Sequence, residues 1–271
     1  MENAIDCSLT FPQPTIQIEE LTAMLEAGLP FQMVRYGDGE WLSITGYEFG
    51  ANVDGHHYFP EMARDLRRTL KRPHKWPYMY AISLLCGKGL NEAARTEYCP
   101  HQTNIIFRNA IEWLYANGVQ IPFLKPYPIY EAFKERRLKP FTSELRNKRM
   151  VFVGPGFMRA LHPAWFNFVG FVEIPEIDCY QELSRIYDDI VRAINIEQPD
   201  VIGFACGMPT KILIDRIYRE VITGPSITMI DFGSVFEPCI GRDSRSRFGE
   251  EDLHQLALSN FDGLLIGDSN S

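Results

Sequence analysis

The second half of the chain alternates short apolar segments with longer amphipathic ones. Strands are predicted over residues 150–153, 168–174, 201–205 and 227–230, and helices over residues 181–196 and 210–221. Strands that alternate with helices of about 10–15 residues are typical of a parallel sheet covered on both faces. The pattern therefore predicts an α/β fold with a Rossmann-like, mostly parallel sheet and helices on both faces.

The first half shows the same alternation less regularly. Apolar periodicity predicts helices over residues 16–27, 59–70 and 104–116, and strands over residues 31–36, 79–85 and 119–124. No internal repeat and no Gly/Ser-rich linker marks a boundary between the halves. We therefore expect a single domain over residues 1–271.

The composition is that of an ordinary globular protein. Of 271 residues, 45% are hydrophobic and 23% are charged, which excludes disordered and collagen-like chains. No apolar run approaches about 18 residues and no signal peptide is visible, so we expect a cytoplasmic protein without a membrane span. The net charge of −8 disfavours a partner bound mainly through phosphates. The six cysteines are scattered without metal-ligand spacing, which is typical of reduced thiols.

Ligands of parallel α/β sheets bind at the carboxyl ends of the strands. The segments that follow the predicted strands are therefore the candidate site. These segments are residues 37–40, 154–156, 175–178, 206–210 and 231–237.

Arg35–Trp41, with the sequence RYGDGEW, is the most informative of these segments. Asp38 and Glu40 lie two residues apart just after a strand, where both carboxylates can bind one hard cation. A divalent metal held by one or two carboxylates and by substrate phosphates is typical of sites for nucleotide diphosphates. The alternative interpretation is a surface turn whose two acids are solvated.

Two further segments place glycines after a strand. Val151–Ala160 (VFVGPGFMRA) is similar to the start of a dinucleotide-binding fingerprint, but Arg159 stands where the third glycine belongs. In Phe204–Leu213 (FACGMPTKIL), Pro209 and Thr210 begin a helix whose free N–H groups predict a phosphate site. The alternative interpretations are a plain strand-to-loop turn and an ordinary capped helix.

The last predicted strand leads into Asp231, within the sequence IDFGSVFEP. Asp-Phe-Gly also occurs in protein kinases, but the chain lacks their glycine-rich hairpin, VAIK-like lysine and HRD loop. Asp231 and Glu237 remain as two carboxylates at the expected site edge.

These segments resemble those of the GT-D-type glycosyltransferases. Members of that family share an Arg-aromatic-Gly-Asp-Gly-Glu segment, which Arg35–Glu40 matches at every position. The looser matches, in chain order, are Pro175 with Asp178–Tyr180, Gly207–Thr210 with Met208 inserted, and Asp231–Ser234 with Ser234 replacing a histidine. The resemblance implies a Rossmann-like sheet, a UDP-sugar donor, and Mn or Mg bound by Asp38 and Glu40.

The sequence therefore predicts a metal-dependent glycosyltransferase, a hexosyl- or pentosyltransferase that moves a sugar from a nucleotide sugar to a hydroxyl. Asp38 and Glu40 are the expected metal ligands, and Asp231 and Glu237 are the candidates for a general base, with Asp178 next. The expected substrate-binding residues are Arg35, Gly37, Gly154, Gly156, Asp178, Gly207 and Thr210.

The acidic net charge favours a glycan or glycoprotein acceptor over nucleic acid, although the basic cluster Arg64–Arg72 could serve as a local nucleic-acid patch. Two other functions stay open. One is a nucleotide- or NAD-binding oxidoreductase that uses Gly154-Pro155-Gly156, and the other is a non-catalytic module that binds nucleotide sugars.

Overall fold

The computed structural model describes residues 16–47, 56–82, 101–121, 123–124, 127–161, 165–222, 226–242 and 253–261. Six strands form one sheet in the order β2-β1-β6-β5-β3-β4. Their bounds are β1 Gln32–Tyr36, β2 Tyr78–Ile82, β3 Met150–Pro155, β4 Phe168–Ile174, β5 Val201–Phe204 and β6 Thr228–Asp231. β3 pairs in parallel with β4 and with β5, and β5 pairs in parallel with β6. The predicted parallel α/β fold is confirmed.

The chain divides into two compact units, one formed by Met33–Tyr127 and the other by Gln17–Gln32 with the residues from Pro128 onward. The first unit contains α2 Asp38–Thr45, α3 Pro60–Lys71 and α5 His101–Ala116. At its centre the rings of Tyr36, Trp41, Tyr80 and Phe123 pack together, with centroid distances of 5.6 to 6.4 Å.

Two predictions for the first unit differ from the structure. The described residues of the strand expected over 119–124 form an isolated bridge instead, in which Leu124 pairs with Ala81. The predicted strand 79–85 is β2, whose expected end beyond Ile82 lies outside the described residues. Where a turn was expected after residue 36, helix α2 begins at Asp38, because the extended backbone of Gly37 and the side chain of Glu40 cap its first turn.

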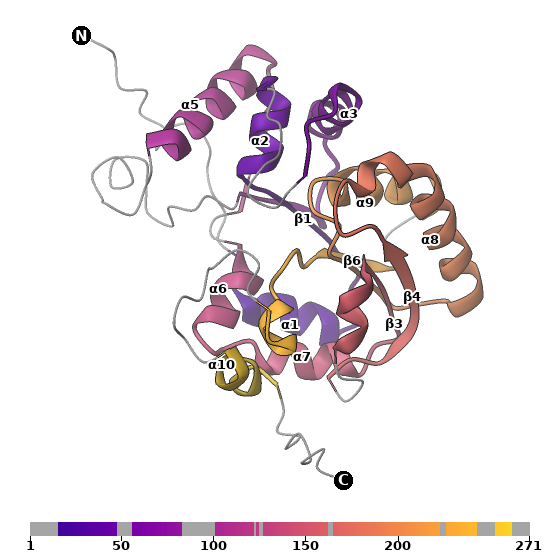
Figure 1. Cartoon of the computed structure of the whole chain (residues 1–271). Helices are drawn as coiled ribbons and strands as arrows, with labels where there is room; N and C mark the ends of the chain where they lie inside the picture. The colour runs from indigo at the N-terminus through magenta and orange to yellow at the C-terminus, as the bar shows by residue number, and fades with distance from the viewer. Residues whose placement is uncertain are drawn as a thin grey trace. The chain divides into compact units, whose positions relative to one another are not determined.

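The second unit contains the four strands β3–β6 and most of the helices (Figure 1). The bounds are α1 Ile18–Glu26, α6 Pro128–Lys134, α7 Lys139–Arg146, α8 Leu183–Glu197, α9 Thr210–Glu220 and α10 Leu253–Ser259, with the 3-10 helices η2 Gly156–Ala160, η3 Cys179–Glu182 and η4 Glu237–Ile240. α8 and α9 pack on one side of these strands, and α1 and α7 lie on the other side (Figure 1). The predicted helices 16–27, 181–196 and 210–221 are confirmed within a few residues.

The core of the second unit explains why its strands form. All residues of β3, β5 and β6 are buried and most of them are apolar, as expected for a sheet with helices on both sides; the polar residues are Thr228 and Asp231 of β6. β4 ends the sheet and is more exposed, with only Val172 and Ile174 buried among its seven residues. The carboxyl ends of β3, β4, β5 and β6 lie at one edge, because these neighbouring strands are parallel.

Candidate functional site

Helix α2 carries Asp38 and Glu40, the two predicted metal ligands. Gly37 is the N-cap with an extended backbone (φ −106°, ψ −165°), so Asp38 is the first helical residue and Glu40 the third. The N–H of Gly37 donates to Oε2 of Glu40 over 2.8 Å, which forms a capping interaction. The side chain of Glu40 is nearly buried, whereas that of Asp38 is half-buried. Glu40 therefore stabilises the start of α2 whatever else it binds.

The carboxylates of α2 suit a hard divalent cation that takes most of its ligands from elsewhere. Side chains two residues apart on a helix do not face each other, so Asp38 and Glu40 do not form a cation cage by themselves. Among the residues that the structure describes, no three or more His, Cys, Asp or Glu side chains are arranged so that they could hold a metal ion. This donor set fits a Mg²⁺ or Mn²⁺ ion completed by phosphate oxygens and water, the usual arrangement for nucleotide substrates.

Arg35 lies in β1, three residues before Asp38, and its side chain is only 7% exposed. Its guanidinium carbon lies 5.8 Å from the centre of the Tyr127 ring, within reach of a cation–π interaction. The structure thus places this predicted substrate residue in the interior of the first unit, directly before the capped turn at Gly37.

In the second unit, three of the four strands that end at the carboxyl edge, β4, β5 and β6, lead into a residue with positive φ. Asp178 after β4 has φ 56°, Gly207 after β5 has φ 60°, and Gly233 after β6 has φ 54°. A non-glycine residue in this left-handed region is uncommon and costs about 1 kcal/mol or more. Asp tolerates this region better than most residues, and Arg136 and Gln198 also have positive φ, so the φ of Asp178 alone assigns it no function. Asp178 lies half-buried at the carboxyl edge.

Packing requires glycine at Gly154, whereas at Gly156 only the movable end of the Glu173 side chain lies close. A Cβ on Gly154 would lie 2.7 Å from the ring of Phe152, and one on Gly156 would lie 2.9 Å from Oε1 of Glu173. β3 continues through Pro155, and the five-residue 3-10 helix η2 follows it. A dinucleotide fingerprint needs the N-terminus of an α-helix at this place. The geometry at Gly154-Pro155-Gly156 therefore weighs against the NAD-binding alternative.

Thr210, a predicted substrate residue, holds the loop between β5 and α9 from within. Its side chain is fully buried, and its Oγ1 accepts the N–H of Cys206 at 3.3 Å. On the other side, the Cys206 carbonyl accepts the thiol of Cys179 at 3.2 Å. Burial raises the pKa of the Cys179 thiol to about 12 and also raises the pKa of Cys206. These two thiols are neutral packing groups, which the scattered cysteine pattern did not locate.

Asp231, a predicted general base, is the last residue of β6 and is completely buried. Its Oδ2 lies 2.9 Å from Nζ of Lys211, whose side chain is 1% exposed. The same Nζ donates to the Gly207 carbonyl over 3.1 Å. Sequence reasoning did not single out Lys211, because a lysine in the first turn of a helix carries no motif. The structure brings Asp231, Lys211 and Gly207 together.

The other predicted carboxylate, Glu237, begins η4 and is 8% exposed. Its backbone N–H donates to the Ser234 carbonyl, which fixes the turn after β6. Of the three carboxylates considered as a base, Asp231 and Glu237 are thus buried, and Asp178 is the more accessible one.

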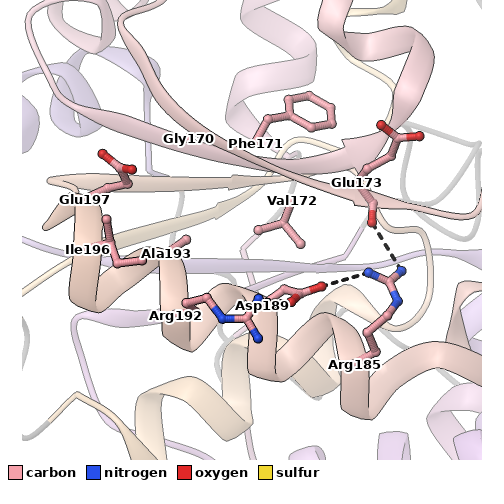
Figure 2. Close-up of a pocket in the computed structure, with 10 residues that line it drawn as sticks. All are labelled: Gly170, Phe171, Val172, Glu173, Arg185, Asp189, Arg192, Ala193, Ile196 and Glu197. Carbon is pink, nitrogen blue, oxygen red and sulfur yellow. Dashed lines mark hydrogen bonds and ion pairs between the residues drawn. The ribbon is translucent and has the colours of Figure 1, made fainter.

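A pocket of about 420 Å³ opens between β4 and α8, outside the predicted site (Figure 2). Two arginines and three acids line it together with apolar side chains. Arg185 donates to the Glu173 carbonyl at 3.3 Å and forms an ion pair with Asp189 at 2.9 Å (Figure 2). None of the substrate, metal or base residues predicted from the sequence lines this pocket.

Three solved structures resemble the chain over most of its length. One is a domain of unknown function 1792, DUF1792, with a TM-score of 0.60 and 15% identity over 83% of this chain and 79% of that one. A second is described as a DUF1792 domain with a distinct glycosyltransferase fold, with a TM-score of 0.58, 14% identity and coverage of 93% and 91%. The chain has this fold. The third is described as a new glycosyltransferase (DUF1792) from Streptococcus sanguinis, with a TM-score of 0.58, 15% identity and coverage of 93% and 96%.

No protein-family model matches the sequence, and no curated protein matches it. At 14–15% identity, the three solved structures establish the fold of the chain. Among the described residues, no helix is long and apolar enough to cross a membrane.

Proposed function

We propose that this protein is a metal-dependent glycosyltransferase that moves a sugar from a nucleotide sugar, a UDP-sugar, to an acceptor hydroxyl. The observation that carries the proposal is the coincidence of two features. The fold is that of DUF1792 domains described as glycosyltransferases, and the segment Arg35–Glu40 lies at the carboxyl end of β1, where α/β proteins bind ligands.

In the proposed reaction, Asp38 and Glu40 would hold Mn²⁺ or Mg²⁺ next to the donor diphosphate. The cation, when bound, neutralises the charge that develops on the leaving diphosphate. Asp38 is the more accessible of the two carboxylates, and Glu40 would bind through the group that also caps α2. Arg35 and Gly37 would shape this end of the donor site, Arg35 by its buried charge and Gly37 by its extended backbone.

The loop between β5 and α9 is the proposed contact for the donor phosphates in the second unit. Gly207 turns this loop in the left-handed conformation, and the first turn of the eleven-residue helix α9 follows at Thr210. Backbone N–H groups at such a helix start bind phosphate oxygens. Thr210 would support the loop through its hydrogen bond with Cys206. Gly154 and Gly156 would contribute backbone to the part of the donor site that binds the nucleoside.

The general base of an inverting reaction needs a carboxylate that can reach an acceptor hydroxyl. Asp231 is fully buried and paired with Lys211, so it lacks the access that this role needs. We assign the role to Asp178, which is half-buried at the same edge, and keep Glu237 as the second candidate.

The proposed acceptor is a glycan or a glycoprotein. The net charge of −8 disfavours nucleic acid, although Arg64, Arg68 and Lys71 on α3 are exposed and could bind anionic groups. A non-catalytic nucleotide-sugar module would share the fold and the donor contacts but would not turn over a donor.

A thermal-shift screen of nucleotide sugars and NADH, each with and without Mn²⁺, tests the proposal. A glycosyltransferase predicts stabilisation by one nucleotide family only when the metal is present. Metal-independent stabilisation by NADH alone would support the oxidoreductase instead. Turnover of the stabilising donor with glycan acceptors then separates an enzyme from a binding module.

A further inference from the structure

Lys211 and Asp231 form a buried ion pair that joins two neighbouring strands of the second unit. Lys211 is the second residue of α9, which follows β5, and Asp231 ends β6. Their charged atoms lie 2.9 Å apart, with side-chain exposures of 1% and 0%. Lys211 also donates to the carbonyl of Gly207, at 3.1 Å.

Filling this part of the core with an ion pair costs desolvation free energy. Two buried charges lose their hydration, and well-packed apolar residues of similar size are often as stable or more so. The first turn of a helix also disfavours a cation, because the helix dipole is positive there. A purely structural need for volume therefore does not explain Lys211 at this position.

The contacts of Lys211 show what the pair fixes. Its Nζ holds the carbonyl of Gly207, the residue whose φ of 60° turns the loop between β5 and α9. The same loop is held at Cys206 by the hydroxyl of Thr210 and by the thiol of Cys179. Inward-facing groups of the loop are thus held by buried side chains. Asp231 in turn fixes the cation that holds Gly207.

We propose that Lys211 and Asp231 are a positioning pair that sets the Gly207 turn for donor binding. This inference rests on the proposed function, in which that loop contacts the donor phosphates. Asp231 then acts through Lys211 and takes no proton from the acceptor. Losing either charge frees the Gly207 carbonyl to rotate, and the backbone of the turn no longer has the conformation that the donor binds.

The test replaces the pair by apolar residues, K211M/D231L, so that no charge is left alone. The matched control is R219M/D215L, which removes another ion pair of α9, joined at 2.9 Å and with Asp215 likewise buried. Urea unfolding measures stability, calorimetric titration of UDP with Mn²⁺ measures affinity, and hydrogen exchange of the peptide spanning residues 204–212 measures loop order.

We expect K211M/D231L to fold with stability close to wild type, to bind UDP at least about tenfold more weakly, and to exchange faster in residues 204–212. The control should leave UDP affinity and the exchange of this loop unchanged. Wild-type UDP affinity and wild-type exchange in K211M/D231L would overturn the inference. If K211M/D231L has the stability of wild type or more and its UDP affinity is also unchanged, the pair is only structural.

Two further arms keep the outcomes separate. If K211M/D231L does not fold, K211M/D231N serves instead, because it also removes both charges while keeping the size of the side chain at position 231, and the same loss of affinity is expected. If the wild type itself binds no UDP, the proposed function fails. The exchange of residues 204–212 still decides whether the pair orders the loop, and unchanged exchange would overturn that as well.

Discussion

At the scale of single residues, Glu40 joins local folding to the proposed chemistry. Its carboxylate caps α2 through the Gly37 N–H, and we also propose it as a metal ligand. Asp38, two residues earlier in the same helix, has a half-exposed side chain and no such capping bond to Gly37. The two acids of one short motif should therefore respond differently to neutralisation.

Asp38→Asn and Glu40→Gln should each lower turnover at least about tenfold at limiting Mn²⁺, because the cation loses a charged ligand. Asp38→Asn should change the free energy of unfolding by only about 0.5 kcal/mol, whereas Glu40→Gln should cost about 1 kcal/mol through the weakened cap. Turnover assays and urea unfolding measure both effects. Glu61→Gln, an exposed acid in the first turn of α3, is the control. Full activity of both variants would remove Asp38 and Glu40 from the metal site.

Gly207→Val should weaken UDP binding about tenfold and cost about 1–2 kcal/mol of stability, because a β-branched residue resists φ of 60°. Gly28→Val is the matched control, since Gly28 has φ 63° and lies after α1, far along the chain from the loop. The control should lose similar stability and keep its UDP affinity. Equal UDP affinity in the two variants would place the phosphates elsewhere.

The buried thiols give a prediction about pH. Because burial raises the pKa of Cys179 to about 12 and also raises that of Cys206, neither thiolate forms in the folded protein near neutral pH. Iodoacetamide at pH 8 should therefore modify both residues far more slowly in native protein than in urea-unfolded protein, as followed by peptide mass spectrometry. Rapid native modification of either residue would show that its surroundings are open to solvent.

At the scale of elements, the boundaries that the sequence predicts best are those with strong local signals. β3 and β5 are continuous apolar runs, and α8 and α9 show clear helical periodicity, so all four were predicted. The sequence does not predict helix α2, because two glycines at positions 37 and 39 are typical of a turn. The cap of α2 also depends on the side chain of Glu40, three residues after Gly37. The apolar pattern of residues 119–124 is typical of a strand, yet among the described residues of this segment Leu124 alone forms a β-bridge.

The junction of β4 and η3 is where the proposed base can be tested. Asp178→Asn should lower transfer by about 10² to 10⁴ while leaving UDP affinity nearly unchanged, because a base acts only on the acceptor hydroxyl. Asn also tolerates the left-handed conformation of Asp178, so the fold should be preserved. Glu237→Gln is the comparison. If Glu237→Gln shows this loss and Asp178→Asn does not, the assignments exchange places. Full activity of both variants would exclude both residues as the base.

At the scale of the whole molecule, the alternation of strands and helices was enough to predict a parallel α/β fold. The strand order β2-β1-β6-β5-β3-β4 was not predictable, because it depends on which strands pair across long stretches of sequence. The same limit applies to the site. Local pattern predicts Asp38, Glu40 and Asp231 as site residues, but the burial of Asp231 against Lys211 follows from the packing of β6 beside β5.

The central claim is a metal-dependent site for a nucleotide diphosphate, and calorimetric titration of UDP tests it most directly. The account predicts binding in the presence of Mn²⁺ that weakens at least about tenfold when EDTA removes the metal, because the cation would neutralise the diphosphate. NADH, titrated under the same two conditions, should show no comparable binding. UDP affinity that is unchanged by EDTA, or NADH binding in place of UDP binding, would contradict the account.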